Sequence, residues 1–483
     1  MPLNPLDVLT QQIDVFTDPR LSSRIVDIQP APEGGYFALA QTPLIPGSEA
    51  EISNGFLLRF DDHHVLLWTV PFSVLDLNEP EPTRAKITPE AISVGRSGVF
   101  VTGTSSGRTL PPAAVVFVAK FSFDGAYEWV RTYGPYLFDG CKVPASANGF
   151  ARSLVRLPPP EDDRMMLLFH TAHSGGGTAQ PSATDSLSAA IYVIDEDGQR
   201  AVPFMTRLFG SGQAIPSRLR ILPTLGPTIV GQTRSVDPNV SPWDGWLARV
   251  TTDGMPLEQA RFDLQADTVL KDVAEGPSGI VSIGTFHQAF QQAFVATHKG
   301  DGLVTWAAKI APPEDSEAFA TEVNVIRPLD DRWVVAGNLD LTSDKEQARP
   351  WLAGLEPNAH GIEWQKNYPV NPIDKASSFY SLWLQPDTIA VAGGQIARRA
   401  TPPRGTFIDA MPFLAVSETT PSTPDLRCSA PTPAVLKKLP FSTGLLDAMF
   451  DRMPATNHLW TGASFALEAD PRTLCREGQE PPG

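Results

Sequence analysis

The chain repeats one phrase with variations: an apolar strand led by an aromatic residue, a turn of the Asp-Gly type, and a strand that often carries tryptophan. The clearest copies are FVAKFSFDGAYEW (117–129), WLARVTTDGMPLE (246–258) and FVATHKGDGLVTW (294–306). More degraded copies are FLLRFDDHHVLLW (56–68) and WLAGLEPNAHGIEW (351–364). Because a recurring unit of this kind stacks against its own neighbours, the phrase limits the fold before any single residue is considered.

A second pair of predicted strands precedes each phrase. It consists of an apolar segment, a turn, and an apolar strand that ends in glycine and a polar residue, as in AISVGRSGVFVTGT (91–104) and VLKDVAEGPSGIVSIGT (269–285). The turns of the phrase recur roughly every sixty residues, near His63, Asp124, Asp197, Asp253, Asp301, Asn358 and Glu418. Four strands at this spacing are typical of a propeller blade. We therefore expect an all-β fold, a seven-bladed β-propeller of four-stranded blades.

The two ends of the repeat array predict how the ring closes. The seventh repeat has three strands and then runs into a Pro-rich stretch. The N-terminal passage TQQIDVFTDPRLSSRIVDI (10–28) matches the strand–loop–strand passage LEQARFDLQADTVLKDV (257–273). We expect the N-terminal strand to complete the last blade, which removes an open sheet edge.

The repeat is lost near residue 425, so we divide the chain into a propeller (1–425) and a Pro-rich C-terminal extension (426–483). A short helix is predicted to begin at Thr443. Its apolar residues are Leu445, Leu446, Met449 and Phe450. The extension either docks on the propeller, which we favour, or presents a segment to a partner.

One column of the repeat holds large aromatic residues. Its members are Phe56, Phe117, Trp246, Phe294, Trp351 and Phe413, with Ala190 as the exception. Such a column is expected where one blade packs its face onto the next. Stacking on a cofactor is the alternative, and we predict packing and no cofactor.

Charge and composition exclude several classes of partner. The 483 residues carry a formal net charge of −16, without a long Lys/Arg cluster, so we exclude nucleic acid as a partner. No stretch reaches the length of a membrane-spanning helix, and no signal-peptide pattern is visible. Cys428 and Cys475 either form one disulfide or remain unpaired thiols. We expect a monomeric propeller.

The passages ISVGRSGVFVTGTSSG (92–107) and FVAKFSFDGAYEWVRTYG (117–134) are similar to the blades of bacterial SBBP-type repeat proteins. The resemblance covers most of residues 10–420 and is weaker in the first, third and seventh repeats. It implies a propeller and often a cell-surface or extracellular setting, and it supplies no catalytic residues. The missing signal pattern favours the cytoplasm instead, so the location stays open between these two. The phrase also loosely resembles quinone-dehydrogenase-type repeats, but their fuller glycine and tryptophan pattern is missing.

Candidate binding residues come from aligning the repeats on the glycine that ends the second strand. The position three residues later is occupied by Pro43, Ser106, His173, Arg234, His287, Asp340 and Ile396. Equivalent loops lie on one face of a propeller, so His173, Arg234 and His287 are predicted to converge on an anionic or polar ligand, with Ser106 and Asp340 as further candidates. Solvation of ordinary loop residues is the alternative. We predict no metal site, because separate blades lie beyond metal-ligand reach.

No recognisable catalytic motif accompanies this scaffold. The sequence lacks an H-E-x-x-H motif and a phosphate-binding loop. We predict no catalytic residues and a non-enzymatic scaffold or binding module for a protein or glycan partner. The alternative is a propeller-fold hydrolase or lyase with a site on the loop face around the central channel.

Overall fold

The computed structural model describes a set of segments that follow the repeat array, with gaps between them. These are residues 9–14, 24–41, 55–76, 83–106, 114–133, 147–173, 186–202, 204–235, 242–287, 291–311, 321–339, 349–367, 378–385, 389–399, 408–418, 435–440, 442–446, 450–454, 457–464 and 470–476. Their regular structure consists of β-strands, which confirms the all-β prediction. None of these segments forms a helix of the length and apolarity needed to cross a membrane.

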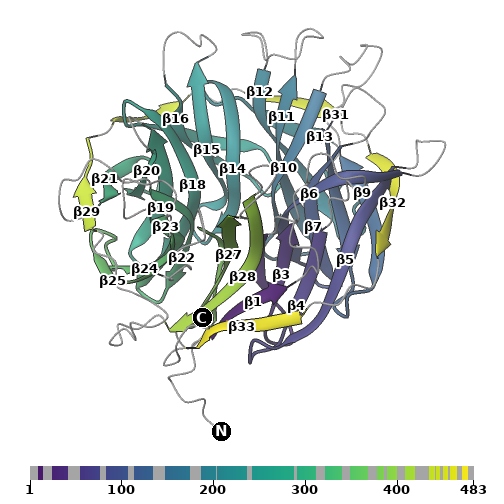
Figure 1. The fold of residues 1–483 in the computed structure, drawn as a ribbon. Helices are drawn as coiled ribbons and strands as arrows, with labels where there is room; N and C mark the ends of the chain where they lie inside the picture. Colours follow the sequence, from purple (N-terminus) through teal and green to yellow (C-terminus); the bar gives the residue numbers. More distant parts are fainter. Residues whose placement is uncertain are drawn as a thin grey trace.

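Six sets of four consecutive strands form antiparallel blades around an axis, as a propeller requires (Figure 1). Blade 1 contains β2 (Arg24–Pro30), β3 (Tyr36–Gln41), β4 (Gly55–Phe60) and β5 (Leu66–Asp76). Blade 2 contains β6 (Thr83–Val94), β7 (Val99–Ser106), β8 (Ala114–Phe121) and β9 (Tyr127–Tyr133). Blade 3 contains β10 (Ala147–Arg156), β11 (Arg164–His173), β12 (Ser186–Asp195) and β13 (Phe204–Leu208).

The next three blades follow the same order. Blade 4 contains β14 (Gly212–Leu222), β15 (Gly226–Ser235), β16 (Asp244–Val250) and β17 (Pro256–Asp263). Blade 5 contains β18 (Asp267–Gly276), β19 (Gly279–His287), β20 (Gln291–His298) and β21 (Val304–Ala311). Blade 6 contains β22 (Thr321–Leu329), β23 (Arg332–Leu339), β24 (Arg349–Leu355) and β25 (Ile362–Asn367).

A further sheet combines strands from both ends of the chain. It contains β26 (Ser378–Gln385), β27 (Ile389–Arg399), β28 (Ile408–Glu418), β1 (Leu9–Asp14) and β33 (Asp470–Arg476). Strand β1 pairs antiparallel with β28, so that Thr10 lies opposite Ala415. The N-terminal strand thus follows three late strands in the position of a fourth strand.

The core of the molecule lies between neighbouring sheets. The first strand of each sheet contacts the first strands on both sides, and β2 contacts β6 on one side and β26 on the other. Each hydrophobic cluster is shared by two adjacent sheets; Ile25 of β2, for example, packs in one cluster with Val391 of β27. Burial of apolar side chains between sheets therefore holds the sheets together around the axis.

The aromatic column is buried between blades, which confirms the packing interpretation. The rings of Phe56, Phe117, Trp246, Phe294 and Trp351 are fully buried, while the side chain of Phe413 lies outside the described residues. In most blades the aromatic residue lies across from a glycine of the second strand, as Phe117 lies across from Gly103. Blade 3 inverts the arrangement, because Ala190 lies across from Phe169. The exception in the sequence is therefore an exchange of the large and small residues between two strands.

The Asp-Gly turns are hairpins that need one residue in the left-handed region. Gly125 and Gly302 have φ of 88° and 80°, which glycine adopts without steric cost. The degraded turns of blades 1 and 6 place His64 and Ala359 at the same point, with φ of 62° and 58°. The turns of blades 1 and 6 therefore keep the left-handed backbone conformation although the residue at that point is not glycine.

The C-terminal extension forms strands and follows the outer edges of the sheets. It contains β29 (Val435–Lys438), β30 (Ser442–Leu446), β31 (Phe450–Pro454) and β32 (Asn457–Ser464), followed by β33. These strands pair in turn with β21, β17, β13, both β9 and β5, and finally β1. In Figure 1 the yellow strands β29, β31, β32 and β33 lie around the outside.

The short helix predicted at Thr443 is wrong, because β30 and β31 occupy that stretch. Residues in this stretch pair with the outer edges of β17 and β13, so backbone bonds to an existing edge override the local helical pattern. Cys475 lies in β33 and Cys428 lies outside the described residues, so the disulfide alternative stays a prediction.

The glycine of the second strand gives a stability prediction. A Cβ at Gly284 would collide with the carbonyl oxygen of Val269 and lie 2.6 Å from Cζ of Phe294. We expect Gly284→Ala to lower the free energy of unfolding by about 1–3 kcal/mol, measured by urea denaturation. Gly300→Ala is the matched control, since a Cβ at Gly300 meets open space. Equal effects of the two substitutions would contradict the close approach of the strands.

Candidate functional site

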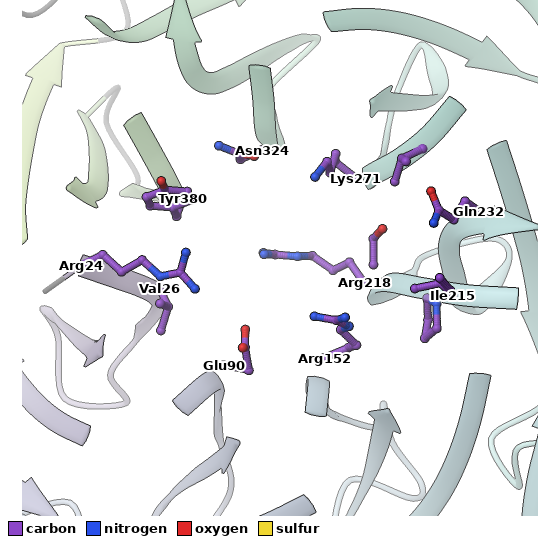
Figure 2. Close-up of a pocket in the computed structure, with 13 residues that line it drawn as sticks. Arg24, Val26, Glu90, Arg152, Ile215, Arg218, Gln232, Lys271, Asn324 and Tyr380 are labelled. Atoms are coloured by element: carbon purple, nitrogen blue, oxygen red, sulfur yellow. The ribbon is translucent and has the colours of Figure 1, made fainter. Parts of the chain in front are cut away.

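A cavity of about 350 Å³ lies where the first strands of the sheets meet (Figure 2). Its walls come from β2, β6, β10, β14, β18, β22 and β26, with Gln232 added by β15. The cavity is therefore on the propeller axis, the place in this fold where side chains from every sheet converge.

A β-bulge in each first strand supplies the cavity wall. The pairing of first and second strands shifts register by one residue in every sheet, and the extra residue faces the axis. These residues are Val26, Glu90, Arg152, Ser217, Lys271, Asn324 and Tyr380, and all of them line the cavity. The second-strand glycines belong to the same geometry, because the carbonyl before the bulge occupies the space where a Cβ would lie.

The cavity is basic although the chain is acidic. Arg24, Arg152, Arg218 and Lys271 line it, and in the described part of the chain Glu90 is its single lining carboxylate. The chain as a whole has a formal net charge of −16. Positive charge has thus been concentrated at the axis of an acidic protein.

Two of these cations contact neighbouring side chains, and the other two keep hydrogen-bond donors without a partner in the described residues. Arg24 donates from Nε to Oε1 of Gln41 (3.0 Å) and lies over the ring of Tyr380, while Lys271 Nζ is 3.7 Å from a carboxylate oxygen of Glu322. Nε of Arg152 is buried without a hydrogen-bond partner. Arg218 forms no hydrogen bond within the described residues, and its side chain extends toward the middle of the cavity (Figure 2). The two guanidiniums hold donors that an anion can use.

Glu90 lies among these cations. Burial raises the pKa of Glu90 above its ordinary value, and Arg152, Arg24 and Arg218 oppose that rise. The carboxyl group is therefore held closer to neutrality than an exposed glutamate, which reduces its repulsion of an anion in the same cavity.

In blades 1, 3 and 5 the residue after the bulge joins one sheet to the next. Oδ2 of Asp27 accepts a hydrogen bond from N–H of Ile92 in the following blade (2.9 Å), and Oγ of Ser153 accepts one from Leu219 (3.1 Å). In blade 4 this position is Arg218, whose guanidinium has donors and no acceptor. Arg218 cannot make the same bond to blade 5, and its side chain faces the cavity instead.

Asp272 is the most heavily bonded residue of this kind. It is fully buried, binds Arg220 through two hydrogen bonds of 2.8 and 2.9 Å, and binds Arg327 of blade 6 at 2.9 Å. Burial opposes its charge, but Arg220 and Arg327 outweigh burial and hold the pKa of this carboxyl well below its usual range. The cluster links blades 4, 5 and 6 directly behind the cavity wall.

Four of the predicted binding residues lie at or next to the ends of second strands, one strand further from the axis than the first strands that line the cavity. Ser106 and His173 are the last residues of β7 and β11, and their side chains lie outside the described residues. His287 ends β19 and is exposed, while Arg234 is held by Gln213 and lies over the ring of Trp243. Asp340 and Pro43 lie outside the described residues, and Ile396 lies within β27.

The alignment on second-strand glycines missed the residues of the inner ring. The signal was present in the first strands, where a charged or polar residue interrupts an otherwise apolar run. Examples are Glu90 in TPEAISV, Arg152 in FARSLV and Lys271 in VLKDVA. Without the bulge, the period-2 pattern of a strand predicts that these side chains face solvent.

Comparisons with known proteins supply no argument about function. No protein-family model and no curated protein matches the chain. The chain is similar to the hemagglutinin-neuraminidase ectodomain of parainfluenza virus 5, with a TM-score of 0.43, 11% identity, and coverage of 86% of this chain and 85% of that one. It is also similar to hydrazine synthase of Kuenenia stuttgartiensis, with a TM-score of 0.41, 13% identity, and coverage of 78% and 96%. At these values the likeness says nothing about chemistry.

The Asp272 cluster predicts a large stability effect. Asp272→Asn leaves Arg220 and Arg327 without their counter-charge, and we expect the free energy of unfolding to fall by about 3–5 kcal/mol in urea denaturation. Ser153→Ala removes a neutral acceptor between blades and should cost about 1 kcal/mol. Because the folded protein holds the pKa of Asp272 down, its contribution is complete above the ordinary aspartate pKa and is lost as pH falls below it. A variant with the same acid sensitivity as the wild type would contradict this assignment.

Proposed function

We propose that the protein is a binding module whose axial cavity takes an anionic ligand. The observation that carries the proposal is the surplus of cations in the cavity, with Arg152 and Arg218 holding unused donors. Guanidinium groups bind carboxylates and phosphates through paired hydrogen bonds, which makes them suited to such a site.

The cost of placing several like charges in one cavity favours a ligand-binding role over a purely structural one. Like charges that share a partly dehydrated cavity repel one another, and burial lowers the pKa of Arg218, with the neighbouring Arg220 adding to the effect. The Asp272 cluster shows how this chain compensates the neighbouring Arg220 and Arg327, with a carboxylate at hydrogen-bond distance. A bound anion supplies the same compensation to Arg152 and Arg218.

The remaining wall suits a ligand with hydroxyl groups, such as an acidic glycan. Ser217, Gln232 and Asn324 contribute hydroxyl and amide groups beside the cations. A ligand larger than the cavity would extend toward the ends of β11, β15 and β19, where His173, Arg234 and His287 lie. Ser106 and Asp340 remain candidates from the sequence alone. A protein partner would reach the same cavity with an acidic side chain.

A hydrolase or lyase is the second candidate, and Glu90 is the observation in its favour. A buried carboxyl with a raised pKa is able to hold a proton for general acid catalysis, and Tyr380 lines the same cavity. Release of product from a bound ligand would separate this function from binding alone.

For the architecture we propose seven blades closed by the N-terminal strand, with residues 1–425 as the propeller and residues 426–483 as an extension along its outer edges. The pairing of β1 with β28 and the contact of β2 with β26 support closure. Membership of the SBBP-type repeat proteins remains a prediction from the sequence.

Closure predicts an effect of N-terminal deletion. Removing residues 1–18 eliminates β1, which leaves β28 and β33 without the strand between them. We expect the thermal midpoint to fall by about 5 °C or more, because several backbone hydrogen bonds are lost together. Deletion of residues 1–8, which precede β1, is the control. An unchanged midpoint for the longer deletion would mean that β1 does not close the ring.

The binding proposal is tested by calorimetric titration with inorganic phosphate and with citrate at low ionic strength. We expect Arg218→Gln and Arg152→Gln each to weaken binding about tenfold, since each removes a charged hydrogen bond. Glu90→Gln should strengthen binding by removing the one acidic group of the wall. Arg200→Gln is the matched control, because Arg200 is exposed beyond the turn after β12, at the other end of its blade.

Added salt should weaken the interaction, as screening does for charged partners. Absence of binding by either anion, or equal affinity of the Arg218 and Arg200 variants, would overturn the proposal.

A further inference from the structure

A second cavity of about 210 Å³ opens between blades 2 and 3. Thr88, Thr104 and Ala114 form its blade 2 side, and Phe150 and Ala151 form its blade 3 side. Oγ1 of Thr104 accepts a hydrogen bond from N–H of Ala151 (3.0 Å), which fixes the two blades relative to each other beside the cavity. The space is a slot between two packed sheets.

The slot and the axial cavity are adjacent and share two lining residues. Glu90 and Arg152 line both of them. Both are bulge residues of adjacent blades, so they stand at the junction where the slot meets the axis. Arg218 lines only the axial cavity and Phe150 lines only the slot, so a ligand that contacts both has to extend past Glu90 and Arg152.

The wall of the slot differs chemically from the wall of the axial cavity. Apart from the shared Glu90 and Arg152, its lining residues are two threonines, two alanines and Phe150, so they carry no charge. The ring of Phe150 stacks on His170 at a centroid distance of 5.7 Å. Burial lowers the pKa of His170 to about 3, with Arg152 adding to the effect, so the imidazole behind Phe150 is neutral at physiological pH.

The slot between blades 2 and 3 therefore has the apolar ring of Phe150 in its wall and lies beside the cationic axial cavity. Water in such a slot contacts few polar partners, and its displacement by an apolar group is favourable. An anion without an apolar group would fill the axial cavity and leave the slot to solvent.

We propose that the ligand is an organic acid of two parts, with its carboxylate held by Arg152 and Arg218 and a compact aromatic or branched apolar group placed in the slot against Phe150. This inference rests on the anionic ligand proposed above and assigns its class. The carboxylate orients the molecule, and the slot selects for the size and polarity of the attached group.

The test compares acids that differ in the attached group. Acetate, propionate, phenylacetate and 3-phenylpropionate are titrated calorimetrically into the full chain, with inorganic phosphate as a purely anionic probe. We expect at least one aryl acid to bind about tenfold more tightly than the matching alkyl acid, the gain that a compact apolar group makes in a fitting pocket.

Two substitutions separate the two parts of the site. Phe150→Ala should abolish the gain of the aryl acid while phosphate binding stays within about twofold of the wild type, and Phe150→Leu should keep part of the gain. Arg218→Gln should weaken all of the acids and phosphate alike. Phe123→Ala is the control for loss of a half-buried aromatic ring, because Phe123 lies in the turn between β8 and β9, and unchanged far-ultraviolet circular dichroism verifies that the variants fold.

The outcomes distinguish this inference from the function on which it rests. Binding of phosphate and acetate without an aryl gain, or an aryl gain that survives Phe150→Ala, overturns the two-part ligand and leaves the anion site standing. Failure of every anion to bind overturns both.

Discussion

Each first strand of the described sheets carries one extra residue, and this bulge connects the assembly of the propeller to the contents of its axis. The extra residue turns a side chain into the axial cavity, while the next residue turns toward the neighbouring blade. In blades 2, 4, 5 and 6 the residue across from the bulge is a glycine, because a carbonyl of the first strand fills the place of its Cβ. One local irregularity therefore shapes blade contacts and determines the residues that face a ligand.

The seven versions of this bulge are not equivalent, and their differences carry the chemistry. Where the residue after the bulge is Asp27, Ser153 or Asp272, it accepts a hydrogen bond from the next sheet. Where it is Arg218, the acceptor is lost, and N–H of Val273 in the next blade is bonded by the side chain of Asp272 in its own strand. Asp272 thus substitutes for the missing bond and also neutralises Arg220 and Arg327, while the guanidinium of Arg218 has no hydrogen-bonded carboxylate within the described residues.

The sequence predicted the four-stranded repeat and the buried aromatic column, because both follow from side-chain patterns with a short period. Phe117 and Trp351 mark the column without reference to any contact between distant residues. The residues that line the axial cavity were not predicted, because each of them depends on a β-bulge. A bulge turns one side chain to the opposite face of the strand and leaves the amino-acid composition unchanged. In the sequence Arg152 resembles a solvent-facing strand residue. The register of β10 against β11 is what shows that it lies at a bulge. The extension was read as helical at Thr443, because local pattern carries no information about the sheet edges that pair with β30.

The partners of β1 lie at the far end of the chain, since it pairs with β28 on one side and β33 on the other. During synthesis this segment leaves the ribosome nearly four hundred residues before β28 exists, an interval of roughly 20 to 80 s at ordinary rates of translation. Its backbone groups have no sheet to join for all of that time. The native pairing of β1 with β28 consequently forms late in synthesis, and the edge groups of β1 wait for it while the intervening blades are made.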